Sequence, residues 1–208
     1  MARQASPYVD APRLPEQDEI DVASLLAQTT GDLELEIGPG RGMFLLERLA
    51  AAPDARVIGL EIRRKWSQLV DEKVRARGLG ARARVLADDA RLALAKLRPD
   101  GAVARVFVHF PDPWWKKRHA KRFVIGDALV GEIARLLRPG GELFVQTDVE
   151  DRAAQYVAEI AKDLRLSPAG DAPGSPRLSA NPYGARSNRE KRADEDGLPV
   201  HRMRWTRA

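Results

Sequence analysis

Cysteine is absent from this chain of 208 residues, which excludes disulfide bonds and zinc sites built on thiolates. Only three histidines occur, His109, His119 and His201, and their wide spacing does not indicate a metal centre. No apolar run approaches the ~20 residues of a transmembrane helix, and residues 1–20 lack the apolar core of a signal peptide. We therefore expect a cytoplasmic protein that uses neither a metal ion nor a membrane.

Positive charge is concentrated in two stretches of the chain. The formal net charge is +5, yet residues 1–35 carry two arginines against seven acids. In contrast, residues 114–122 hold five bases and no acid, and residues 186–207 hold seven bases against four acids. Such local excess favours a polyanionic partner, of which nucleic acid is the commonest kind.

Short apolar runs alternate with helical patterns along most of the chain. Strands are predicted at residues 33–38, 56–61, 83–87, 103–110, 142–148 and 199–205. Helices are predicted at residues 43–51, 63–77, 90–97, 122–137 and 149–162. This alternation predicts an α/β fold with helices on both faces of a mostly parallel sheet, in one domain over residues 1–208. Residues 168–186 are expected to form a long loop and residues 1–20 a flexible N-terminal segment.

A glycine-rich turn follows the first predicted strand. The sequence "EIGPGRG" places Glu36 before Gly38, Gly40 and Gly42. Glycines allow a tight turn and a close approach of the backbone to a ligand, and ligands of open α/β sheets bind beyond the carboxyl ends of the strands. A dinucleotide fingerprint would need glycine at position 43, which is methionine here. The motif alone is also compatible with an ordinary strand-to-helix turn.

Acidic residues follow the next two predicted strands. Glu61 comes some twenty residues after the glycines, where a carboxylate can accept both hydroxyls of a ribose; it could equally be a solvated acid at a strand end. In "ADDA", Asp88 or Asp89 could accept a hydrogen bond from an adenine amine, and we favour Asp89. The same aspartate would serve as a helix N-cap.

These motifs, in this order, resemble those of class I S-adenosylmethionine-dependent methyltransferases. The shared features are E-x-G-x-G-x-G, an acid after the second strand, an acid after the third, and "RPGG" before the fifth. The resemblance implies a Rossmann-like fold with a seven-stranded, mostly parallel sheet whose last strand is antiparallel. It also implies S-adenosylmethionine as cofactor, bound by residues Glu36, Gly38, Gly40, Gly42, Glu61, Asp89 and Asp112.

A longer motif after the fourth predicted strand narrows the resemblance. "FPDPWWKKRHAKR" (110–122) resembles the F-P-D-P-W-x-K-x-R-H-x-K-R signature of bacterial tRNA (guanine-N7)-methyltransferases. "TD" (147–148) and "SNREKR" (187–192) extend it, so that it covers roughly residues 32–207. Two positions depart from the family. Ser187 replaces the usual threonine, and Arg189 stands where an aromatic residue is common.

The resemblance implies transfer of a methyl group to N7 of a guanine in the variable loop of tRNA. N7 has an in-plane lone pair, so no proton must be removed before attack. Asp112 is our candidate catalytic residue, because a carboxylate that accepts from guanine N1–H or N2–H would bind the transition state better than the ground state. For the tRNA substrate we expect contacts from Lys116, Lys117, Arg118, Lys121, Arg122, Asp148, Ser187 and Glu190.

Several of these residues have a plain structural alternative. Asp148 could be a helix N-cap, and Ser187 with Glu190 could form a capping box. Trp114 or Trp115 could stack on a base or pack in the core. His109 is expected in the core of its strand. Two other functions remain open from the sequence: methylation of another RNA or a small molecule, and RNA binding by a catalytically silent relative.

Overall fold

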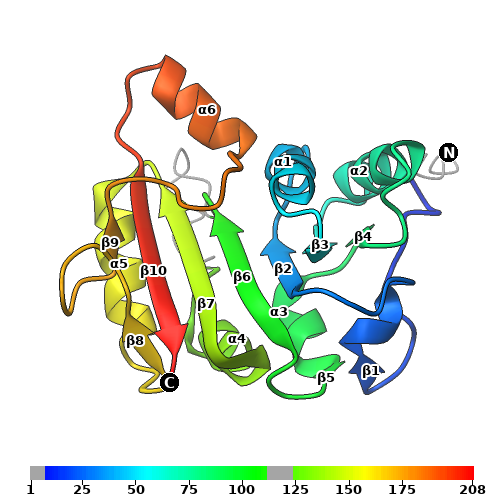
Figure 1. Ribbon diagram of the computed structural model, residues 1–208, viewed down its shortest axis with the longest axis horizontal. Helices are drawn as coiled ribbons and strands as arrows, with labels where there is room; N and C mark the ends of the chain where they lie inside the picture. Colours follow the sequence, from blue (N-terminus) through cyan, green and yellow to red (C-terminus); the bar gives the residue numbers. More distant parts are fainter. Residues whose placement is uncertain (1–7, 112–123) are drawn as a thin grey trace, which may run out of the picture.

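The computed structural model describes residues 8–111 and 124–208, and a sheet of eight strands forms its centre (Figure 1). The strand order is β4-β3-β2-β6-β7-β10-β8, with β9 paired to β10. Neighbours from β4 to β7 pair in parallel, whereas β10 is antiparallel to β7, β8 and β9. The strands are β2 Leu33–Ile37, β3 Arg56–Leu60, β4 Ala83–Leu86, β6 Val103–His109, β7 Leu137–Thr147, β8 Leu166–Pro168, β9 Arg177–Leu178 and β10 His201–Arg207. The predicted mostly parallel sheet with a final antiparallel strand is confirmed, but it has eight strands instead of seven, because the two-residue strand β9 also pairs with β10.

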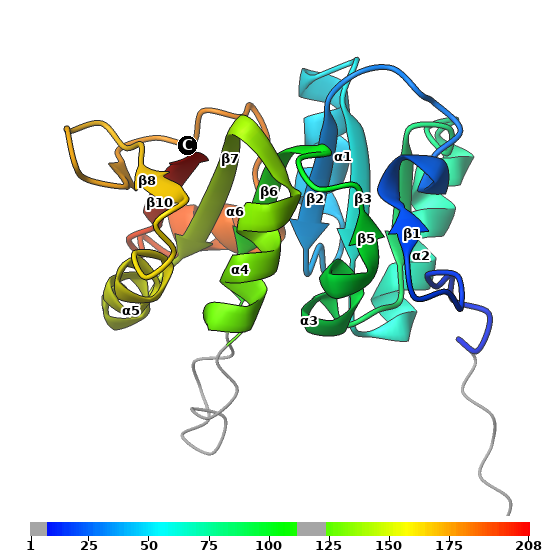
Figure 2. The same cartoon turned by 90° about the horizontal axis from the view of Figure 1, so that it is seen from below.

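Helices cover both faces of this sheet. They are α1 Met43–Ala51, α2 Arg64–Ala76, α3 Ala90–Ala93, α4 Asp127–Leu136, α5 Glu150–Ile160 and α6 Asn188–Glu195, with 3₁₀ turns η1 Val22–Leu25 and η2 Leu94–Lys96. Helices α3, α4 and α5 pack together along one face (Figure 2). Helices α1 and α2 pack on β3 and β4 from the other side. Within the described residues, every helix is too short or too polar to cross a membrane.

The two faces of the central strands differ in polarity. Toward α3, α4 and α5 the strands present leucine, isoleucine, valine, methionine and tryptophan, and we call this side the apolar face. On the opposite side, the polar face, the same strands carry charged and amide side chains around a small aromatic cluster. Polar-face residues named below are Glu34, Glu36, Arg105, His109, Glu142, Gln146, Arg202 and Arg204.

The N-terminal prediction needs correction over residues 8–20. The sequence predicts a flexible segment here, but these residues pack against the body of the protein. The Ala87 N–H donates to the Pro12 carbonyl at 2.6 Å, and the Leu14 N–H donates to Asp88 Oδ2 at 2.8 Å. Farther along, β1 Ile20–Asp21 pairs in parallel with β5 Leu97–Arg98. The polar composition of the segment concealed these backbone contacts.

The starts of two elements differ most from those predicted. Helix α4 begins at Asp127 instead of residue 122, because Gly126 is extended, with φ −115° and ψ 171°. Strand β7 begins at Leu137 instead of residue 142, so the "RPGG" segment lies within the strand and shifts the register against β6. The loop predicted at residues 168–186 holds the two-residue strand β9 and little other regular structure.

Candidate active site

The predicted cofactor residues gather at one edge of the sheet. Because β2, β3, β4, β6 and β7 are parallel, their carboxyl ends meet at the edge where α1 and α6 lie (Figure 1). We call this the ligand edge, since open α/β sheets bind ligands there. It brings together segments far apart in sequence: the glycine turn, Glu61, the Asp88–Asp89 pair and Asp148.

The glycine turn leaves open space beside its first two glycines. Gly38 and Gly40 have φ values of 72° and 55°, which favour glycine. A Cβ atom on Gly38 would meet nothing within 4 Å, and one on Gly40 would come no nearer than 3.8 Å, to Arg63 Nη2. Gly42 is different, because a Cβ there would lie 2.3 Å from Val70 of α2. Gly38 and Gly40 thus provide room for a ligand, whereas Gly42 allows α1 and α2 to pack closely.

Glu36 is a buried carboxylate with spare hydrogen-bonding capacity. It lies on the polar face near the carboxyl end of β2, and its Oε2 has no partner among the described residues. Burial, and secondarily the nearby charge of Glu61, raise its pKa from 4.5 to about 8. Buried polar atoms in folded proteins are normally hydrogen-bonded, so the bare Oε2 indicates a place for a donor that is not part of the described chain.

Glu61 connects the end of β3 to the glycine turn. Its Oε2 accepts from the Gly40 N–H at 2.9 Å, and its Oε1 accepts from the N–H and Nε of Arg63 at 2.9 and 3.0 Å. Its burial excludes the alternative of a solvated acid at a strand end. A carboxylate has about four lone-pair sites, so these three bonds leave one site for a ribose hydroxyl. The next residue, Ile62, is an apolar side chain at the ligand edge that is 63% exposed, which no pattern in the sequence indicated.

The two aspartates after β4 have separate structural partners. Asp88 accepts from the Leu14 N–H, which fixes the N-terminal segment. Asp89 is the N-cap of α3, accepts from the Arg91 N–H at 3.1 Å and pairs with the Arg91 guanidinium. The capping alternative is therefore realised at Asp89. The contact of either residue with adenine stays a prediction.

The end of β6 leads into the long sequence motif through a strained residue. Phe110 has φ 48°, and its N–H donates to the Gln146 carbonyl at 2.8 Å. A bulky residue in this conformation costs about 1–3 kcal/mol, and such strain clusters at functional sites. Asp112 and the tryptophans and bases that follow lie outside the described residues, so their roles stay predictions. They are Trp114, Trp115, Lys116, Lys117, Arg118, His119, Lys121 and Arg122.

Asp148 and Arg189 form an ion pair at the end of β7. The side chain of Asp148 is nearly buried, and that of Arg189, on α6, is 30% exposed. The N-cap of α5 is Val149, so Asp148 is not a helix cap. Its place in the substrate site stays a prediction, and its partner Arg189 is one of the two positions that depart from the family pattern.

Ser187 and Glu190 realise only half of a capping box. Ser187 Oγ accepts from the Glu190 N–H at 3.1 Å and caps α6. The Glu190 carboxylate turns away, is fully buried, and accepts from Asn181 at 3.1 Å and from Arg202 at 2.9 Å. Glu190 therefore joins α6 to β10, and its proposed contact with guanine stays a prediction.

His109 and Gln146 form a buried pair near the same edge. The expectation that His109 lies in the core is confirmed. Its Nδ1 bonds Gln146 Oε1 at 2.8 Å, while both Nε2 atoms lack a partner among the described residues. Burial lowers the pKa of His109 from 6.5 to about 4, against the opposing effect of this hydrogen bond. Because a carbonyl oxygen only accepts, Nδ1 carries the hydrogen of this neutral ring.

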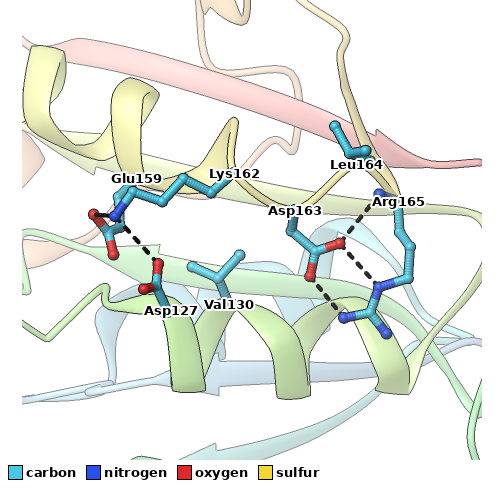
Figure 3. Close-up of a pocket in the computed structure, with 7 residues that line it drawn as sticks. All are labelled: Asp127, Val130, Glu159, Lys162, Asp163, Leu164 and Arg165. Carbon is cyan, nitrogen blue, oxygen red and sulfur yellow. Dashed lines mark hydrogen bonds and ion pairs between the residues drawn. The ribbon is translucent and has the colours of Figure 1, made fainter.

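A surface hollow of about 400 Å³ lies elsewhere, between α4 and the end of α5 (Figure 3). Its charges neutralise one another: Lys162 pairs with Asp127 and Glu159, and Arg165 pairs with Asp163. None of the predicted site residues lines it. The described part of the chain also holds no cluster of three or more histidine or acidic side chains suited to a metal ion.

Comparison with known proteins is consistent with this geometry. A family model described as "Putative methyltransferase" matches residues 31–203. The tRNA (guanine-N(7)-)-methyltransferase of Myxococcus xanthus is 35% identical, over 84% of this chain and 83% of its own length. That of Anaeromyxobacter dehalogenans is 39% identical, over 90% and 92%. Among solved structures, the 16S rRNA methyltransferase KamB has a TM-score of 0.65 at 18% identity, covering 92% of this chain and 95% of its own, and shows the shared fold. The chain belongs to the tRNA (guanine-N(7)-)-methyltransferase family.

Proposed function

We propose that this protein transfers a methyl group from S-adenosylmethionine to N7 of a guanine in tRNA. Membership of the family indicates which reaction the protein catalyses. The observation that assigns this reaction to the ligand edge is the buried, unpartnered oxygen of Glu36 beside the open glycine turn. The resemblance further suggests the variable loop as target and the cytoplasm as location.

The residues at the ligand edge fit this cofactor. The Glu36 carboxylate would accept from the ammonium of the methionine end, which supplies the donor that Oε2 lacks. The open space beside Gly38 and Gly40 would admit the body of the ligand. Glu61 would accept from a ribose hydroxyl, and Asp89, or else Asp88, from the adenine amine.

The reaction requires the protein to position the cofactor and the guanine and to stabilise the charge that develops on the purine. When bound, the cofactor would supply a methyl group on a positively charged sulfur. The lone pair of N7 would bond to the methyl carbon in line as the carbon–sulfur bond breaks, and the sulfur would leave with that electron pair as a neutral thioether. Because N7 carries no proton, no general base is needed for the attack. Positive charge develops on the purine, and Asp112 would stabilise it by accepting from N1–H or N2–H.

Incubation of the purified protein with unmodified tRNA and labelled S-adenosylmethionine tests this function. We expect incorporation of label, and chemical scission at 7-methylguanosine should map to one position in the variable loop. Label at another ring position or in another RNA would overturn the assignment. Isothermal titration with the cofactor separates an active enzyme from a silent RNA-binding relative, for which no binding heat is expected.

A matched pair of glycine variants tests the cofactor cradle. Gly40 and Gly78 both have positive φ, and a Cβ atom on either would come no nearer than 3.8 Å to another residue, so valine strains both alike. Gly40→Val should abolish cofactor binding while tRNA binding remains, since only Gly40 lies at the ligand edge. Gly78→Val should retain cofactor affinity. Equal affinities of the two variants would contradict the placement of the pocket.

A further inference from the structure

A group of cations surrounds Trp66 where α2 begins. Arg41 of the glycine turn lies over the Trp66 ring, with Cζ 5.2 Å from its centroid, and Lys65 Nζ lies 5.6 Å from the same centroid. Arg63 and Arg64 come directly before Lys65, at the start of α2. The four cationic side chains are exposed, and Trp66 is half-buried. We call these five residues the Trp66 patch.

The patch is unusual in this protein because its charge is largely not neutralised. Most arginines of the described residues pair with a carboxylate, including those on the polar face and those of α6. Among residues 8–111 and 124–208, no carboxylate forms an ion pair with Arg41, Arg64 or Lys65. Arg63 does pair, with Glu61, and this bond fixes the patch to the ligand edge.

The aromatic ring gives these cations a preferred position. A cation over a tryptophan ring gains about 0.5–1 kcal/mol at an exposed site, which limits its freedom without cancelling its charge. An exposed, ordered group of positive charge favours a polyanion, because each phosphate contact releases a condensed counterion. The ligand edge is where a nucleic-acid substrate must approach, so the partner with matching charge is the substrate backbone.

We propose that the Trp66 patch is a docking surface for the sugar–phosphate backbone of the tRNA, apart from the target nucleotide. This inference rests on the proposed function and adds a second contact region. It differs from the bases of residues 116–122, which the sequence resemblance predicts to neutralise phosphates around the target nucleotide. The patch lies beside the cofactor cradle, so a tRNA bound there would span the cofactor site.

Two double variants of one helix test this proposal. Arg64→Ala with Lys65→Ala removes two charges from the patch. Lys73→Ala with Arg77→Ala removes two exposed charges from the other end of α2, about 12 Å farther along from Lys65 to Lys73 at ~1.5 Å per residue. Each phosphate contact contributes about 0.7–0.9 to the slope of log affinity against log salt. The patch variant should therefore lose about 1.4–1.8 from the slope of tRNA binding, and the control should lose none.

Cofactor titration and thermal unfolding show that both proteins are folded, with equal affinity for S-adenosylmethionine expected. Equal salt slopes of the two double variants, with methylation of tRNA by the wild type intact, would overturn the docking surface and leave the function standing. A wild type that neither binds nor methylates tRNA would overturn both. A patch variant with an unchanged slope and a lost cofactor affinity would place these cations in the cofactor pocket, and would also overturn the proposal.

Discussion

The apolar and polar faces of the sheet are built from the same strands. In β2 the side chains of Leu33, Leu35 and Ile37 join the large apolar core, while Glu34 and Glu36 between them face the other side. On the apolar face, any apolar side chain of suitable size that packs well would maintain the core. On the polar face each buried group needs a specific partner, as Glu34 finds in Arg48 at 2.6 Å and in Arg105 at 2.9 Å.

The two ends of the polar face also differ, and this difference separates residues that stabilise the fold from residues proposed to bind the ligand. Far from the ligand edge, the polar face is fully paired: Glu34, Arg105 and Glu142 form a continuous network with Arg204. Near the ligand edge the pairing among the described residues is incomplete, and the strand side chains with an unpartnered atom are Glu36, His109 and Gln146. Incomplete pairing is therefore a local property of the end where the ligand is proposed to bind.

The largest expected effect comes from the apolar face. Trp205 is buried in the large core, and Trp205→Ala should lower the free energy of unfolding by about 3–5 kcal/mol. Urea unfolding at neutral pH measures this change. Thr206→Ala, at the half-exposed next position, is the control and should cost under about 1 kcal/mol. A similar loss in both variants would mean that the two faces contribute equally at this strand.

The next effect tests pairing on the polar face. Glu190→Ala leaves Arg202 without its carboxylate and should cost about 3 kcal/mol, near the low end of the range for breaking a buried pair because Arg202 is 15% exposed. The double variant Glu190→Leu, Arg202→Met should regain much of this stability, since apolar pairs of similar volume often replace buried ion pairs. Urea unfolding of the wild type, the single variants Glu190→Leu and Arg202→Met, and the double variant gives the coupling. Additive losses would contradict the pairing.

A smaller effect distinguishes two buried groups by their pH dependence. The pKa of Glu36 is about 8 in the folded state against an ordinary 4.5, so the fold binds more protons and loses stability as pH rises from 4.5 to 8. The pKa of His109 is about 4 against 6.5, so stability rises as pH rises from 4 to 6.5. The two trends oppose each other up to pH 6.5, and above it only Glu36 contributes.

The cofactor-free wild type should therefore lose up to about 2 kcal/mol of unfolding free energy between pH 6.5 and 8. Glu36→Gln should lack this decline and should show the gain between pH 4 and 6.5 that Glu36 offsets in the wild type, whereas His109→Gln should lose stability from pH 4.5 to 8. Urea unfolding at a series of pH values makes the comparison. A decline that persists in Glu36→Gln would show that another group titrates there.

Much of the fold could be predicted because its signals are local. Apolar runs located the parallel strands, and the glycine turn marked the ligand edge through its backbone requirement, which Gly38 and Gly40 meet with positive φ. Helix α1 begins and ends where the pattern predicted. The packing of the N-terminal segment could not be predicted, because it depends on hydrogen bonds of backbone groups such as the Pro12 carbonyl. Such bonds are not visible in the pattern of side chains.

The partners on the polar face could not be predicted because they depend on register. The alternation in "HRMRWTR" of β10 is visible in the sequence, but that Arg202 meets Glu190 follows from how α6 lies on β10. The pattern S-x-x-E correctly suggested a cap at Ser187, yet not that the Glu190 carboxylate turns to another strand. Similarly, Asp148 and Arg189 are 41 residues apart, and only the fold brings them together.

The smallest expected change in stability concerns that last pair. Arg189→Leu should alter the free energy of unfolding by no more than about 1 kcal/mol, because the Arg189 end of the pair is 30% exposed and partly screened by water. Its effect should appear in kinetics instead. If guanine N–H groups donate to Asp148 in place of Arg189 when the substrate binds, the Asp148–Arg189 ion pair must break first. The free energy needed to break it makes tRNA binding weaker. Removing the pair should lower the KM for tRNA by up to about fivefold with little change in kcat.

Arg192→Leu, which removes the same charge from an exposed pair on the same helix, controls for the lost cation and should raise the KM or leave it unchanged. A higher KM in Arg189→Leu than in Arg192→Leu would show that Arg189 itself holds the tRNA, and the polar face would then extend into the substrate site through a cation instead of a carboxylate.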